Sequence, residues 1–149
     1  MSQKITPFLW FNDNAGEAMD FYISVFKNGK VISKTDGANG KFFTGEVELE
    51  GQRLMFMNGG PSFVFSEAIS LFVYCENQKE VDFLWDTLSA GGSESQCGWL
   101  KDKYGLSWQI IPTELSKLLS DSAKAQKVMA ALMKMKKLDI AELEKSTRE

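Results

Sequence analysis

Hydrophobic and polar positions repeat along this chain in one order: an apolar strand, an Asn followed three residues later by Glu, and an amphipathic helix. The first copy begins with the apolar residues 8–11 and reaches its Asn at position 14. The second begins with 71–74 and reaches its Asn at position 77, so each element recurs 63 residues further along. Apolar residues in both helices recur with the helical period. A duplicated unit usually places its ligand cavity between the two copies, so the repeat predicts where a functional site lies.

Three further strands follow each copy, so the pattern predicts two βαβββ modules. In the first module we expect a strand at 5–11, a helix at 14–28, and strands at 30–35, 43–50 and 53–57. In the second we expect a strand at 68–74, a helix at 78–90, and strands at 93–97, 99–102 and 106–111. Asn14 and Glu17 have the spacing of a capping box at the start of the first helix.

We therefore predict a single α+β domain in which two tandem modules form a curved, cup-shaped mixed β-sheet. Its parts are module one at 4–58, a linker with Gly and Pro at 59–67, module two at 68–112 and a helical extension at 113–149. Candidate N-caps in the extension are Thr113, Ser122 and Asp139. The pattern leaves open whether these helices pack on their own sheet or on a partner subunit.

Composition is that of an ordinary globular protein, with 44% hydrophobic and 25% charged residues. The net charge of −3 argues against broad binding to nucleic acid or to anionic membranes, which favour a basic surface. No apolar run approaches the ~20 residues that span a bilayer, and nothing near the N-terminus resembles a signal peptide. Cys75 and Cys97 are too few for a disulfide framework, so we expect reduced thiols and a cytoplasmic protein.

The chain contains no histidine, which excludes serine or cysteine catalysis through a histidine base. Any general base would have to be a carboxylate, a Lys or a Tyr. A P-loop, a dinucleotide-binding glycine fingerprint and zinc-type Cys or His spacing are also missing. A typical methyltransferase that uses S-adenosylmethionine needs a doubly wound sheet and a glycine-rich turn, and the pattern shows neither.

Short motifs accompany the repeat. They are Asn12-Asp13-Asn14-Ala15 before Phe21-Tyr22, Gly59-Gly60-Pro61 before the second module, and Gly98-Trp99-Leu100-Lys101-Asp102 with Trp108-Gln109 near its end. In this order, and within two βαβββ modules, they resemble the PhnB-like (3-demethylubiquinone 3-methyltransferase-like) branch of the vicinal oxygen chelate superfamily. That superfamily includes glyoxalase I and bleomycin-resistance proteins. The resemblance covers about residues 4–113 and implies that each module forms half of a cup.

Metal-using relatives imply where a divalent ion would bind. Their ligands are typically His or Glu on the first and last strands of each module. The matching positions here are Thr6 or Pro7, Met55 or Met57, Ile69 or Ser70, and Gln109. Hydroxyl, thioether and neutral amide groups are weak ligands for a divalent transition metal. We therefore expect no metal and no cofactor.

The resemblance also implies a ligand site with aromatic and aliphatic walls and few polar groups. The candidate ligand-binding residues are Phe8, Trp10, Met55, Met57, Ser70, Phe72, Trp99, Ser107, Trp108 and Gln109. Simple core packing is the alternative for the aromatic residues, and core or a dimer interface for the methionines. Gln109 is either a former ligand position that now hydrogen-bonds a small molecule or a strand residue satisfied by backbone. The parity of the first strand is undecided, so Phe8 and Trp10 could exchange roles with Leu9 and Phe11.

The leading hypothesis is a homodimeric protein of the vicinal oxygen chelate type that binds a small molecule without the family's metal. One alternative is a metal-dependent lyase, isomerase or dioxygenase with ligands drawn from Glu46, Glu48 or Asp102. For Glu46, Glu48 and Glu50, however, a solvated strand face is the simpler interpretation. Another alternative is a protein-interaction module that works through the C-terminal helices. Cys97 is expected to be inert, since few groups near it in sequence could lower its pKa.

Overall fold

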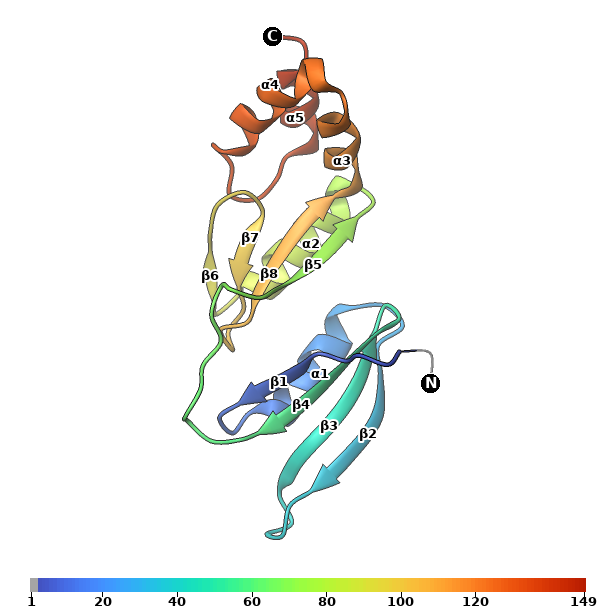
Figure 1. Ribbon diagram of the computed structural model, residues 1–149, viewed down its shortest axis with the longest axis vertical. Helices are drawn as coiled ribbons and strands as arrows, with labels where there is room; N and C mark the ends of the chain where they lie inside the picture. The colour runs from blue at the N-terminus through green and yellow to red at the C-terminus, as the bar shows by residue number, and fades with distance from the viewer. Residues whose placement is uncertain (1–2) are drawn as a thin grey trace. The chain divides into compact units, whose positions relative to one another are not determined.

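A computed structural model describes residues 3–149 of the protein. The chain forms two compact units, and the boundary between them lies after Phe65. This boundary lies within the predicted linker. Each unit holds one four-stranded mixed sheet with a helix against one face, and the second unit adds three C-terminal helices (Figure 1). The α+β class, the two βαβββ modules and the helical extension are therefore confirmed.

The first unit builds its sheet around a parallel pair formed by its first and last strands. Its elements are β1 (Phe8–Phe11), α1 (Ala15–Val25), β2 (Lys30–Asp36), β3 (Phe42–Leu49) and β4 (Gln52–Asn58). The strand order is β1-β4-β3-β2, with β1 parallel to β4 and the other pairs antiparallel. The α1 helix is the crossover between β1 and the rest of the sheet, as a parallel pair requires.

The second unit repeats this topology with the order β5-β8-β7-β6. Its elements are β5 (Ser70–Cys75), α2 (Gln78–Ser89), β6 (Ser93–Glu94), β7 (Trp99–Lys101), β8 (Ser107–Pro112), α3 (Thr113–Ser120), α4 (Ser122–Leu132) and α5 (Ile140–Ser146). Again the strands that come first and last in the sequence of the module, β5 and β8, are parallel neighbours in the sheet. Within residues 3–149, no helix combines the length and the apolar composition needed to cross a bilayer.

Strand parity in the first unit follows from which residues pack against α1. Leu9 and Phe11 of β1 are buried together with Phe56 of β4 and the helix residue Tyr22. Since successive strand side chains point to opposite faces, Phe8 and Trp10 lie on the face away from the helix. The structure thus shows that Leu9 and Phe11 face the helix, whereas the sequence left the orientation of this strand undecided.

The two copies differ by one residue between strand and helix. Buried helix residues such as Tyr22 and Trp85 match at the predicted offset of 63. The buried strand residues Phe11 and Cys75 match at 64 instead, because α1 begins four residues after Phe11 and α2 begins three residues after Cys75. The constant offset predicted for every element is therefore wrong for the strands, where a slip of one residue exchanges the two faces.

The two sheet helices are capped differently at their N-termini. Asn77 caps α2, because its Oδ1 accepts a hydrogen bond from the Glu80 backbone N–H at 2.9 Å. The Asn14 side chain makes no such bond at the start of α1, so the capping box predicted there is wrong. The Ala15 N–H instead donates to Oδ1 of Asn58 at 2.8 Å, across a large sequence separation. The Asn of the repeated motif therefore caps α2, where it is Asn77, but its side chain does not cap α1, where it is Asn14.

Replacing these three Asn residues tests the assignment. Asn77→Ala and Asn58→Ala are each expected to lower the free energy of unfolding by about 1 kcal/mol, because each removes an N-cap acceptor. Asn14→Ala is the matched control and should change it by no more than about 0.5 kcal/mol. Urea unfolding followed by circular dichroism measures all three. A loss for Asn14→Ala equal to that for Asn77→Ala would contradict the capping described.

The C-terminal helices pack on their own unit. A hydrophobic core joins the end of β8 to all three helices and consists of Ile111, Leu115, Val128, Leu132, Leu138 and Leu143. Asp139 caps α5 as predicted, with its Oδ1 3.1 Å from the Glu142 N–H. The predicted caps Thr113 and Ser122 are instead the first helical residues of α3 and α4. The C-terminal helices therefore pack on the sheet of their own chain, which the sequence had left open against packing on a partner subunit.

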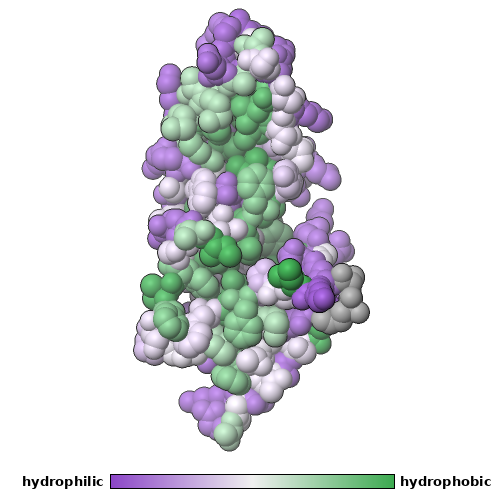
Figure 2. Space-filling model, in the orientation of Figure 1, coloured by the Kyte–Doolittle hydropathy of each residue, from purple (hydrophilic) through white to green (hydrophobic). Residues whose placement is uncertain are grey.

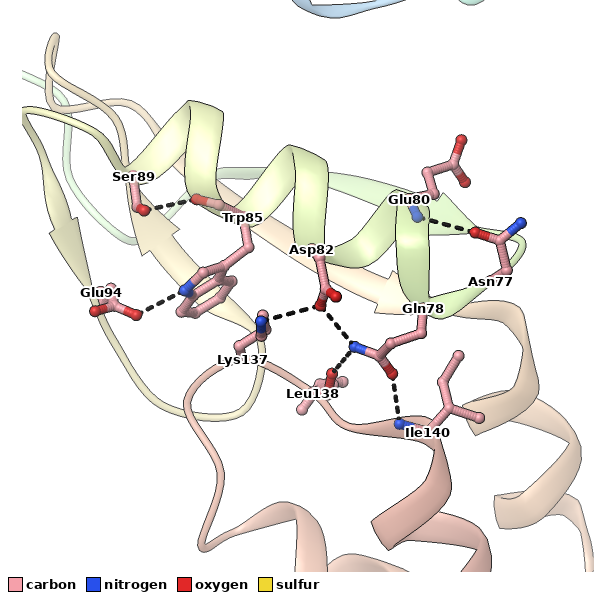
Figure 3. A network of polar contacts seen from close by, with 10 residues as sticks. All are labelled: Asn77, Gln78, Glu80, Asp82, Trp85, Ser89, Glu94, Lys137, Leu138 and Ile140. Carbon is pink, nitrogen blue, oxygen red and sulfur yellow. Dashed lines mark hydrogen bonds and ion pairs between the residues drawn. The ribbon is translucent and has the colours of Figure 1, made fainter.

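Polar contacts fasten the segment before α5 to α2 (Figure 3). Gln78 Nε2 donates to the Leu138 carbonyl at 3.0 Å, and its Oε1 accepts from the Ile140 N–H at 2.8 Å. Asp82 receives a second bond from Gln78 Nε2 at 2.9 Å and forms an ion pair with Lys137 at 3.0 Å. The Gln78 hydrogen bond and the Lys137 cation lower the pKa of Asp82. A side chain in the first turn of α2 therefore orders the extension.

Candidate functional site

Nine of the ten candidate ligand-binding residues lie on the sheet faces that turn away from α1 and α2. We call these faces open face 1, on β1–β4, and open face 2, on β5–β8. Open face 1 carries Phe8, Trp10, Met55 and Met57, and open face 2 carries Ser70, Phe72, Trp99, Ser107 and Gln109. Figure 2 shows hydrophobic surface over both sheets, and Phe8 and Phe72 remain 49% and 47% exposed.

Open face 1 combines an apolar strip with carboxylates. Phe8 lies opposite Met55, which in turn lies opposite Glu46 on β3. One row further along, Trp10 lies opposite Met57. The methionines are therefore half-buried residues of the open face and lie outside the buried core, while a dimer interface remains a prediction for them.

Trp10 is largely occupied by the chain that follows β4. Its indole Nε1 donates to the Gly60 carbonyl at 2.9 Å, and Phe63 packs edge-on against it with ring centroids 5.0 Å apart. A Cβ on Gly59 would clash with the indole ring, so the backbone passes directly over the ring. Trp10 thus anchors the 59–63 segment to its own sheet.

The carboxylates of open face 1 are neutralised by basic side chains. Arg53 Nη1 donates to Glu46 Oε2 at 3.0 Å, and Arg53 Nε lies 3.9 Å from Glu48 Oε1. Lys30 pairs with the second oxygen of Glu48 at 3.5 Å. The expected row of three solvated carboxylates is therefore wrong, because Glu46 is mostly buried in an ion pair and Glu50 lies in the β3–β4 turn.

Open face 2 presents two cross-strand rows of different character. In one row, Gln109 of β8 lies between Phe72 of β5 and Trp99 of β7. In the next row, Ser107 lies between Ser70 and Lys101. The row with the Gln109 amide between two aromatic residues is therefore next to a row that carries two serine hydroxyls and the Lys101 ammonium group. Ile111, further along the same face, is covered by the C-terminal core.

Gln109 is satisfied by a side chain rather than by backbone. Its Nε2 donates to Ser70 Oγ at 3.0 Å, which joins the two rows across β5 and β8. The bond leaves the Gln109 carbonyl oxygen able to accept a hydrogen bond from a small molecule. The structure therefore places these two candidate residues in direct contact.

Trp108 is the candidate that does not join the others. It lies on the opposite face of β8, is 2% exposed, and donates from its indole Nε1 to Oδ2 of Asp102 at 2.8 Å. Oδ1 of Asp102 accepts from the backbone N–H groups of Tyr104 and Leu106 at 2.9 and 3.1 Å. Trp108 is thus core, and Asp102 shapes the β7–β8 turn.

Neither cysteine provides a nucleophile at these faces. Cys75 is fully buried, and burial raises the pKa of its thiol to about 12, with a smaller contribution from the Glu80 charge. Cys97 is half-buried against the C-terminal helices, and its Sγ lies 3.7 Å from the Leu132 carbonyl. Both thiols are free of disulfide bonds.

The resemblance implies where metal-using relatives hold their ligands, and the strand pairing selects among the candidate residues at those positions. On β5 and β8 they are Ser70 and Gln109, which face the same side and touch. In the first unit, the counterpart of Ser70 is Thr6, because equivalent strand residues of the two units lie 64 positions apart. The counterpart of Gln109 is Met55, because Met55 pairs with Phe8 as Gln109 pairs with Phe72. Two hydroxyls, a thioether and an amide do not fit a divalent transition metal. Within residues 3–149, no group of three Cys, Asp or Glu side chains is suited to hold a metal ion.

Several residues at these faces were missed in the sequence. Lys101 shares the parity of Trp99 on β7 and therefore lies on open face 2, a signal that the short strand already contained. Arg53 stands two residues before Met55, and its partner Glu46 was identifiable only from the β3–β4 register. Glu67 lies in the expected linker and pairs with Lys101, which no local pattern indicates.

Comparisons with known proteins agree with this architecture. The sequence profile of the 3-demethylubiquinone-9 3-methyltransferase family matches residues 3–111, so helices α3–α5 lie beyond the matched part. The PhnB protein of Bacillus cereus, which bears the same family name, is 33% identical. It covers 74% of this chain over 100% of its own length, with a TM-score of 0.70. Among proteins with curated descriptions, none matches this chain.

Two more distant structures share the fold. A Pseudomonas aeruginosa protein is 19% identical, with a TM-score of 0.61 over 74% of this chain and 98% of its own. The fosfomycin resistance protein FosX of Listeria monocytogenes, in complex with Mn(II) and sulfate, is 14% identical. Its TM-score is 0.59 over 82% of this chain and 98% of its own. These likenesses extend to the fold alone.

Proposed function

The chain belongs to the 3-demethylubiquinone-9 3-methyltransferase family of the vicinal oxygen chelate superfamily, and from this premise we propose that it binds a small organic molecule without a transition metal. The contact that carries the proposal is the 3.0 Å hydrogen bond between Gln109 and Ser70 on open face 2. The resemblance implies that these two positions hold metal ligands in metal-using relatives. The bond also leaves an amide carbonyl between Phe72 and Trp99.

The surroundings of this contact suit a small molecule. Sites of this kind combine apolar walls with a few placed polar groups. Phe72 and Trp99 supply the apolar surface beside Gln109, and Ser70, Ser107 and Lys101 supply polar groups one row away. A homodimer, as proposed from the resemblance, would add a second copy of each open face.

The alternatives have less support. Glu46, Glu48 and Asp102 are the carboxylates suggested as non-standard metal ligands, and each is held by other groups of the protein. Two apolar residues of α4, Val128 and Leu132, are buried within the chain's own core and do not form a surface for a partner. Methyl transfer from S-adenosylmethionine is not proposed, because both sheets are four-stranded and mixed and no glycine-rich turn follows β1 or β5.

Metal analysis tests the proposal directly. Protein expressed in medium supplemented with zinc, manganese, iron and nickel is expected to retain well below one equivalent per chain after dialysis. Its unfolding temperature should not fall in a chelator, because only a ligand that binds the native state stabilises it by mass action. A stoichiometric metal whose removal lowers the unfolding temperature would overturn the proposal and favour a metal-dependent enzyme.

Small-molecule binding is tested on the same metal-free protein. A library of compounds with a planar apolar part and a hydrogen-bond donor is expected to contain members that raise its unfolding temperature. Gln109→Ala should abolish that shift, whereas Lys79→Ala, an exposed change on α2, should preserve it. Shifts that Gln109→Ala leaves intact would show that open face 2 is not the site.

A further inference from the structure

A recess of about 350 Å3 opens at the β6–β7 edge of open face 2. Its walls include Trp99 and Lys101 of β7, Ser107 of β8, Ser93 of β6 and Glu67 from the segment before β5. All of these residues belong to the second unit. The recess lies in the row of hydroxyl and ammonium groups, next to Gln109.

Ser107 is a buried polar group that lacks a partner. Its residue is 1% exposed, and its Oγ makes no hydrogen bond to any group in the described part of the chain. Buried hydroxyls in native proteins are almost always hydrogen-bonded, so an exception calls for an explanation. Because Ser107 lines the recess, a ligand there could supply the missing partner.

Lys101 already holds a carboxylate in this recess. Its ammonium group forms an ion pair with Glu67, and the two side chains are 41% and 60% exposed. The hydrogen bond and the charge of Lys101 lower the pKa of Glu67. An exposed pair of this kind contributes little to stability, so another carboxylate can replace Glu67 without a large penalty.

The other acidic group of the recess keeps its negative charge but is held toward α2. Glu94 lines it too, but its Oε1 accepts a hydrogen bond from the indole Nε1 of Trp85 on α2 at 2.6 Å. Hydroxyl groups such as those of Ser93 and Ser107 can donate to an acceptor, and Trp99 offers an aromatic surface beside them.

We propose that this recess binds a small organic carboxylate with a planar apolar part, which displaces Glu67 from Lys101 and hydrogen-bonds Ser107. Without ligand, the Glu67 carboxylate occupies the position beside Lys101 that the ligand's carboxylate takes in the complex. The planar part of the ligand lies against Trp99. This inference rests on the proposed function and adds to it the chemical class of the ligand.

Benzoate and its neutral analogue benzamide are the probes, titrated into the full-length protein by calorimetry and by NMR of the backbone amides. Benzoate is expected to bind in the millimolar range and to shift the amide signals of Lys101 and Ser107, with benzamide at least about tenfold weaker. Lys101→Ala should weaken benzoate about tenfold or more, and Glu67→Gln should tighten it several-fold because the competing charge is lost. Lys79→Ala is the charge-matched control and should have no effect.

Ser107→Ala separates a binding role from a structural one. Since the hydroxyl has no partner in the described chain, its removal should leave the unfolding temperature unchanged or higher while weakening benzoate. Benzamide binding as tightly as benzoate, tighter binding after Lys101→Ala, or weaker binding after Glu67→Gln would each overturn the proposal. Failure of benzoate to bind at all would also overturn it but would leave the proposed function standing, because that function is judged by metal content and by the compound library.

Discussion

Asp102→Ala is expected to lower the free energy of unfolding by about 3–5 kcal/mol, because it leaves buried donors without an acceptor. The Asp102 carboxylate is 2% exposed and accepts from two backbone N–H groups and from the Trp108 indole. Hydrogen bonds to a charged acceptor are the stronger kind, and alanine cannot replace any of the three. Chemical denaturation followed by circular dichroism measures the loss.

Asp102→Asn provides the graded control. The Asn oxygen can keep the backbone bonds to Tyr104 and Leu106, but its amide nitrogen then faces the indole N–H, one donor against another. We expect a loss of about 1–3 kcal/mol, and a smaller cost of Trp108→Phe in the Asp102→Asn background than in the wild type. An Asp102→Ala protein as stable as the wild type would contradict the buried role given to this carboxylate.

Leu138→Ala is expected to lower the free energy of unfolding by about 2–5 kcal/mol, the range for removing a buried leucine side chain. Leu138 is fully buried in the core that joins β8 to the C-terminal helices, and its side chain also approaches the backbone at Gly98. Its carbonyl receives the Gln78 bond that orders the start of α5. The cavity left by alanine would therefore loosen the whole extension.

Met133→Ala is the matched control on the same extension. Met133 is 63% exposed, so its truncation should change stability by no more than about 0.5 kcal/mol. Because the extension packs on its own chain, the Leu138→Ala loss should not depend on protein concentration. A loss that diminishes as the concentration rises would indicate instead that a partner subunit holds these helices.

The candidate site was predictable in part. The family resemblance suggested Phe8, Met55, Phe72 and Gln109 as candidates without fixing strand parity, and the structure places them on the open faces. Trp108 was misplaced because a strand buried on both faces shows no alternation that separates one face from the other. Lys101 and Glu67 were missed because their pairing joins segments whose proximity depends on the fold.

The sequence by itself determined the two βαβββ modules, the helical extension and the absence of imidazole chemistry, since periodicity, turn residues and composition are local properties of the chain. Only the tertiary structure decided which face of each strand is open, which Asn caps α1, and which carboxylates are engaged by basic groups. Each of these depends on strand register, and a register shift of one residue turns a side chain from one face to the other. That dependence on non-local pairing is why Ser70 and Gln109 could be named separately from the sequence but recognised as partners only in the fold.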